Sequence, residues 1–157
     1  MAKIQANPND ADALMSLGDE FYTTGDYATA GQWFTKVTQV EPGNVRGFLA
    51  LGATAFNRGD MAGAEAAWKQ AVVIDETNVK AHYDLGFLYL NEQPPDMAGV
   101  QREWTRVVQL DPNSDIATTV KAHLDALASP DPASPAASGV PAASPAGSPA
   151  PFGSAQP

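Results

Sequence analysis

The sequence predicts an all-α solenoid in which antiparallel helix pairs stack side by side. One observation is a Leu-Gly pair that recurs every 34 residues, at Leu17-Gly18, Leu51-Gly52 and Leu85-Gly86. The other is that apolar and turn-forming residues keep the same register around each pair. A fixed period of this length, with apolar positions at helical spacing, is typical of stacked helix hairpins.

Each repeat is expected to hold its Leu-Gly pair in a first helix and to begin a second helix at an acidic cap. The predicted caps are Asp26, Asp60 and Asp96, since Asp is a favoured residue at this position. The repeats end in turns over 41–44, 75–78 and 111–114, whose last residue suits the cap of the next helix. The third repeat has two extra residues over 91–96, in a turn between helices where an insertion costs little.

The glycine of each pair predicts a close approach between the two helices of a repeat. Glycine in the middle of a helix costs roughly 1 kcal/mol relative to alanine. That cost makes sense where the second helix crosses so closely that no side chain fits. We expect Ala30, Ala64 and Val100 to supply the facing surface.

Aromatic residues of the second helices also align, at Phe34, Trp68 and Trp104. With these positions the chain resembles the tetratricopeptide repeat family over residues 11–114. The resemblance implies a right-handed α-solenoid with repeats over 11–44, 45–78 and 79–114, whose first helices line a concave face. It implies an architecture rather than a particular chemistry.

Three flanking segments complete the predicted organisation. Residues 1–10 are expected to be the remnant of a preceding helix and turn. Residues 115–128 are expected to form a helix that caps the last repeat, so that the repeat domain spans 11–128. Residues 129–157 contain eight Pro, eight Ala and six Ser, with one charge and one aromatic ring. This Ala/Pro/Ser-rich tail is expected to be disordered or extended, with a polyproline II bias.

The tail has three interpretations. It is expected to be a linker or spacer. Its four Ser-Pro pairs could instead accept phosphate or O-linked sugar. Docking of the kind that SH3 domains perform lacks a charge anchor, because no Lys or Arg accompanies the prolines.

The charge and composition restrict the possible partners. The formal net charge of −9 disfavours nucleic acid and anionic membrane surfaces. The chain has no cysteine, so it can form no disulfide and no thiolate metal site. No apolar run approaches the roughly 20 residues that a membrane span needs. We expect a soluble domain, either cytoplasmic or extracytoplasmic with an anchor outside this chain, whose oligomeric state stays open.

Neither histidine lies in a catalytic or metal-binding pattern. His82 occupies a packing position of its repeat, and His123 lies on the predicted capping helix. Motifs for nucleophilic hydrolases, phosphate loops, zinc proteases and dinucleotides are missing from the sequence. We therefore expect no enzyme, no catalytic residue, no metal and no cofactor.

The expected functional surface is the concave groove of the first helices. Apolar and aromatic residues with mixed charges around them are typical of a protein-binding hot spot. The predicted groove residues are Met15, Asp19, Tyr22, Arg46, Leu49, Phe56, Lys80, Tyr83, Phe87 and Leu90. Phe56 and Phe87 are the expected anchors.

The resemblance also suggests which partner to exclude. The family includes co-chaperones that hold the terminal carboxylate of heat-shock chaperones with Lys, Arg and Asn on the first helices. The matching positions here are Met15, Asp19, Ala50, Lys80 and Asp84. Only Lys80 suits a carboxylate, so we expect an apolar or basic peptide or helix instead.

The predicted function is a non-catalytic interaction scaffold that aids assembly of a multiprotein complex. The alternative is a permanent subunit of a larger assembly, at a membrane or elsewhere, with the tail threaded along its neighbours.

Overall fold

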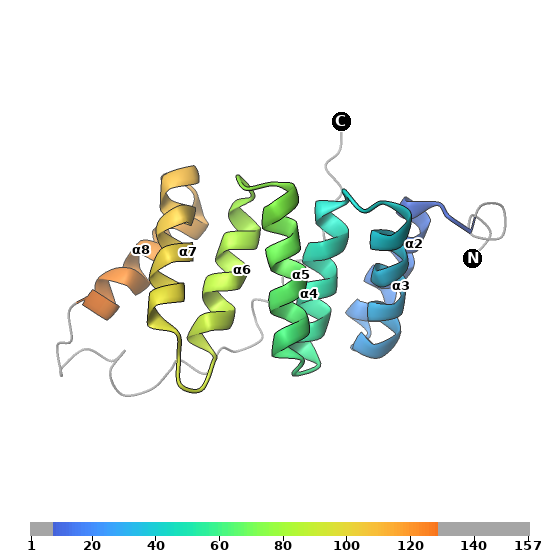
Figure 1. The fold of residues 1–157 in the computed structure, drawn as a ribbon, viewed down its shortest axis with the longest axis horizontal. Coiled ribbons are helices and arrows are strands. Elements are labelled where there is room, and N and C mark those ends of the chain that lie inside the picture. The colour runs from blue at the N-terminus through green and yellow to red at the C-terminus, as the bar shows by residue number, and fades with distance from the viewer. Residues whose placement is uncertain (1–7, 129–157) are drawn as a thin grey trace.

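The computed structural model describes residues 8–128 and arranges them as a row of helices. Figure 1 shows the row running from α2 at one end to α8 at the other. The helices are α2 (Ala11–Thr23), α3 (Tyr27–Val40), α4 (Val45–Asn57), α5 (Met61–Ile74), α6 (Val79–Leu90), α7 (Met97–Leu110) and α8 (Asp115–Ala128). No strand occurs within the described residues. The predicted all-α solenoid is confirmed. The predicted tail, and residues 1–7 of the predicted N-terminal remnant, lie outside the described residues.

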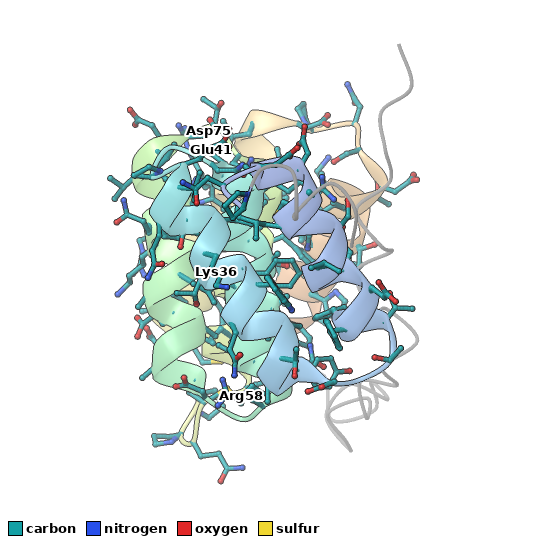
Figure 2. The ribbon with its side chains drawn as sticks, turned by 90° about the vertical axis from the view of Figure 1, so that its right-hand side faces the viewer. Lys36, Glu41, Arg58 and Asp75 are labelled. Carbon is teal, nitrogen blue, oxygen red and sulfur yellow. The ribbon has the colours of Figure 1, made fainter. Side chains whose placement is uncertain are left out.

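Consecutive helices pack against one another as antiparallel neighbours. Figure 2 shows the antiparallel helices from the α2–α3 end of the row. Glu41 and Asp75, which follow α3 and α5, lie at one edge of the molecule, whereas Arg58, which follows α4, lies at the opposite edge. The first helices α2, α4 and α6 therefore run one way and their partners α3, α5 and α7 run back.

Side-chain caps fix where each helix begins. The carboxylates of Asp26, Asp60 and Asp96 accept hydrogen bonds from the backbone N–H three residues later, at 2.9–3.0 Å. Asn44 and Asn78 cap α4 and α6 in the same way, at 2.9 and 3.0 Å. The caps expected from the sequence are therefore present, and each stabilises its helix by about 1 kcal/mol.

The surface that faces each helix glycine differs from the one we expected. The prediction named Ala30, Ala64 and Val100, and these side chains are fully buried. The nearest atoms to a methyl group added at Gly18, Gly52 or Gly86 are instead ring atoms of Phe34, Trp68 and Trp104 respectively, closer than 3.0 Å. The glycine leaves a strip of bare backbone on which a flat ring lies.

Hydrogen bonds hold the two tryptophans in this position. The indole Nε1–H of Trp68 donates to the carbonyl oxygen of Leu49 at 3.2 Å, and that of Trp104 donates to Tyr83 at 3.3 Å. Each ring thus joins the second helix of its repeat to the backbone of the first.

Candidate functional site

Side chains from α2, α4 and α6 meet on one side of the solenoid. Arg46 of α4 and Asp19 of α2 form an ion pair with an N–O distance of 2.7 Å. The Asn57 amide donates to the Tyr22 hydroxyl at 3.0 Å. These contacts join residues that lie 27 and 35 positions apart in the sequence. They place the outer side chains of neighbouring first helices next to one another.

We call this side the first-helix face. It comprises Asp19, Tyr22, Arg46, Phe56, Asn57, Lys80, Tyr83, Asp84, Phe87 and Leu90. Eight of these are among the ten predicted groove residues, and Asn57 and Asp84 are their neighbours on the same first helices. Both lie at helical spacing from the predicted residues of their first helices; Asn57 is exposed, whereas Asp84 is buried.

Two predicted groove residues are not on this face. Met15 is 2% exposed and Leu49 is 7% exposed, and both belong to the apolar core. Met15 packs among the side chains that join α2, α3 and α4, and the Leu49 carbonyl receives the Trp68 indole. The prediction that they line the groove is therefore corrected: they support the face from beneath.

Aromatic rings form the centre of the first-helix face. The rings of Phe56 and Phe87 are 5.6 Å apart between centroids and join α4 to α6. Phe56 also lies 5.9 Å from Trp68, which rests on Gly52. Phe56 packs against the core, whereas Phe87 belongs to neither core cluster among the described residues. Phe87 is half-buried and is therefore the ring best placed for an additional contact.

The cations of the face are paired with acids of the same face. Lys80 contacts both carboxylate oxygens of Asp84 at 2.9 and 3.0 Å. Burial raises the pKa of Asp84 above its ordinary value, while the Lys80 ammonium acts in the opposite direction. Burial likewise raises the pKa of Asp19, and Arg46 opposes that shift. The face therefore offers little net charge to a ligand.

The comparisons with known proteins agree with this architecture. Residues 54–93 match the sequence model of a tetratricopeptide repeat (TPR). The first TPR domain of human RPAP3 is 25% identical, with a TM-score of 0.67 over 78% of this chain and 95% of that one. The described helices form a TPR solenoid.

Other solved TPR structures show the same fold. The first TPR domain of Spaghetti (RPAP3), bound to the HSP90 peptide SRMEEVD, is 25% identical, with a TM-score of 0.66 over 76% of this chain and 94% of that one. The Yersinia enterocolitica chaperone SycD, in complex with a peptide of the translocator YopD, is 22% identical, with a TM-score of 0.69 over 74% of this chain and 91% of that one. No curated protein matches the chain.

A cleft of about 760 Å³ lies elsewhere on the TPR domain, between α5 and α7. It contains none of the ten predicted groove residues. Its walls carry both signs of charge, and its lining residues are Val72, Glu76, His82, Ala98, Gln101, Arg102, Glu103, Thr105, Arg106 and Gln109. The sequence pattern did not indicate this cleft, because its lining depends on how two second helices stack.

His82 forms part of the cleft and holds three segments of the TPR domain together. It is 7% exposed, in keeping with the packing position that we expected. Its Nδ1 lies 2.8 Å from a Glu103 carboxylate oxygen on α7, and its Nε2 lies 3.1 Å from the Glu76 carbonyl oxygen. Both partners are acceptors, so both ring nitrogens donate only when the imidazole is protonated.

This arrangement makes stability depend on pH. The hydrogen bond to Glu103, helped by that to Glu76, raises the pKa of His82, although burial and the Arg106 guanidinium oppose the shift. A folded-state pKa above the unfolded one adds stability at low pH, and this stability is lost as pH rises through the folded value. We expect the free energy of unfolding to fall between pH 6 and pH 8.5, as the His82 imidazolium loses its proton and with it a charged hydrogen bond.

Urea denaturation of the wild type and of His82→Gln at both pH values tests this expectation. The variant should be less stable than the wild type at pH 6 and should lose less stability as the pH rises. An equal pH dependence in both proteins would show that other groups cause the effect.

His123 is the other histidine, and it is exposed on α8 with its ring edge on Trp104.

The described residues were compared with the requirements of a metal site and of a membrane-spanning helix. Residues 8–128 contain no group of three or more His, Cys, Asp or Glu side chains that could hold a metal ion. In the same range, no helix is both long and apolar enough to cross a membrane.

Proposed function

We propose that the TPR domain is a non-catalytic interaction scaffold that binds a segment of a protein partner on its first-helix face and aids the assembly of a complex. The observation that carries this proposal is the Phe56–Phe87 pair. It joins two neighbouring repeats and leaves the half-buried Phe87 ring outside the core clusters. Aromatic residues in such a central position commonly dominate protein-binding energy. The RPAP3 neighbour, which is bound to a peptide, supports the same use of the fold.

The paired charges indicate which segment the face accepts. A ligand carboxylate would have to compete with Asp84 for Lys80 and with Asp19 for Arg46. An apolar or basic segment avoids this competition, because its contacts are with the rings or with the acids. We therefore propose an extended peptide or an amphipathic helix that is rich in apolar or basic residues as the ligand.

The SRMEEVD peptide named for the RPAP3 neighbour provides a direct test of this charge argument. We expect it to bind this protein with a Kd weaker than about 1 mM. Asp84→Asn should strengthen binding measurably, because it frees the Lys80 ammonium while keeping the side-chain shape. Fluorescence anisotropy of the labelled peptide measures both proteins. Micromolar binding to the wild type would contradict the proposed ligand chemistry.

Panning a random peptide library against the full chain tests the function itself. We expect the selected peptides to be enriched in aromatic, aliphatic and basic residues and depleted in Asp and Glu. Their binding should depend on Phe87 and should not depend on Val73, an exposed apolar residue of α5. A selection that yields no peptide above background, or only acidic ones, would overturn the proposal.

A further inference from the structure

The first-helix face has a chemical counterpart in the same chain. Its centre is aromatic, and its charges are paired with one another. Residues 129–157 are rich in Pro and Ala, carry no Lys or Arg, and have a single aromatic ring, that of Phe152. Proline-rich segments bind surfaces lined by aromatic side chains, against which the proline rings pack. Because this tail has no Lys or Arg to anchor docking of the SH3 kind, its contact would depend on ring packing alone. The two parts of the chain therefore match in chemistry.

We propose that residues 141–152 bind the first-helix face of their own molecule, with the Phe152 ring against Phe87, and so compete with the partner segment. This inference rests on the proposed function, because tail and partner use the same face. The tail then acts as an internal competitor that lowers the apparent affinity for weak ligands.

The charges of the two parts are compatible with this contact. The only charge of the tail is Asp131, 21 positions before Phe152. A neutral segment can cover the face without removing Arg46 from Asp19 or Lys80 from Asp84. The cleft between α5 and α7 suits the same segment less well, because Glu76, Glu103, Arg102 and Arg106 line it.

The length of the connection also fits. Helix α8 ends at Ala128, so 24 residues lead from it to Phe152. A Pro-rich segment in the polyproline II conformation advances about 3.1 Å per residue, so this length can reach up to roughly 75 Å. Neighbouring packed helices lie about 8–10 Å apart, so α4, four helices before α8, lies at most about 40 Å away and within this reach. A linker that can span two sites makes their contact intramolecular and raises the effective concentration of the tail at the face. A contact too weak to detect between molecules can thus be well populated within one.

Paramagnetic labelling of the full chain tests the contact directly. Because the sequence has no cysteine, Ser154→Cys creates a single site for a nitroxide label. We expect the amide signals of Phe56 and Phe87 to lose more than half of their intensity, while those near Val73 on α5 change little. Adding Phe152→Ala to the labelled chain should restore the signals. Weak, uniform broadening, or broadening centred on the α5–α7 cleft, would overturn the proposal.

A mixing control separates contacts within and between molecules. Chains that carry the nitroxide but no ¹⁵N are mixed with ¹⁵N-enriched chains that carry no nitroxide. We expect the amide signals of the ¹⁵N chains to keep their intensity in the mixture. A loss as large as in the sample whose chains carry both nitroxide and ¹⁵N would refute an intramolecular contact.

Competition separates this inference from the proposed function. Phe152→Ala should strengthen the binding of a library-selected peptide to the full chain by about 2–10-fold, the range expected if the tail occupies the face for half to nine-tenths of the time. An unchanged affinity, in a protein whose peptide binding still needs Phe87, would refute the tail contact and leave the proposed function intact. Loss of the Phe87 requirement would refute both.

Discussion

The Gly52→Leu variant should lose roughly 3 kcal/mol or more of its free energy of unfolding. Any side chain at this position meets the Trp68 ring, because an added Cβ would lie closer than 3.0 Å to its atoms. The ring has little freedom to move, since it is 3% exposed and donates a hydrogen bond to Leu49. Urea denaturation gives the change from the shift of the unfolding midpoint.

Gly43→Leu is the matched control for this prediction. Gly43 lies in the turn between α3 and α4, and a Cβ added there meets nothing within 4 Å. Its replacement should change the stability far less than the Gly52 replacement does. If both variants unfolded at the wild-type midpoint, the close contact between glycine and ring would be wrong.

The Phe87→Ala variant should bind a library-selected peptide about 5–150-fold more weakly, which corresponds to about 1–3 kcal/mol. Phe87 is half-buried beside Phe56, so under the proposed function its removal would delete a contact surface for the ligand. The melting temperature should change little, because Phe87 belongs to neither core cluster among the described residues. Calorimetric titration and thermal unfolding measure the two quantities.

Val73→Ala is the matched control for Phe87→Ala. Val73 is an apolar residue of α5 that is 74% exposed and lies outside the first-helix face. Its replacement should leave both the affinity and the melting temperature unchanged. A large loss of stability in Phe87→Ala, with unaltered binding, would assign the ring to the core and remove it from the proposed site.

Local signals explain why the fold could be predicted from the sequence. The caps at Asp26, Asp60 and Asp96 depend on a hydrogen bond to a backbone group only three residues away, so the sequence pattern contains the whole interaction. The packing across each glycine, unlike the caps, depends on residues that are distant in the sequence. Which side chain covers Gly52 depends on the crossing of two helices, and the pattern offered both a small residue, Ala64, and an aligned aromatic.

The candidate site was predicted less completely, because the repeat pattern treats matching positions as equal. Met15, Leu49 and Tyr83 occupy the same position of three repeats, yet the first two are buried and Tyr83 is half-buried. Their different neighbours in the stack cause this difference. The ion pair of Arg46 with Asp19 joins two repeats, and a single-repeat pattern contains no information about it.

Mapping the amide shifts of the full chain on titration with a library-selected peptide tests most directly whether the first-helix face is the binding surface. We expect the largest changes on α4 and α6, around Phe56, Tyr83 and Phe87, with small changes on α5 and α7. Changes centred instead on Arg102, Arg106 and the cleft beside them would contradict the account.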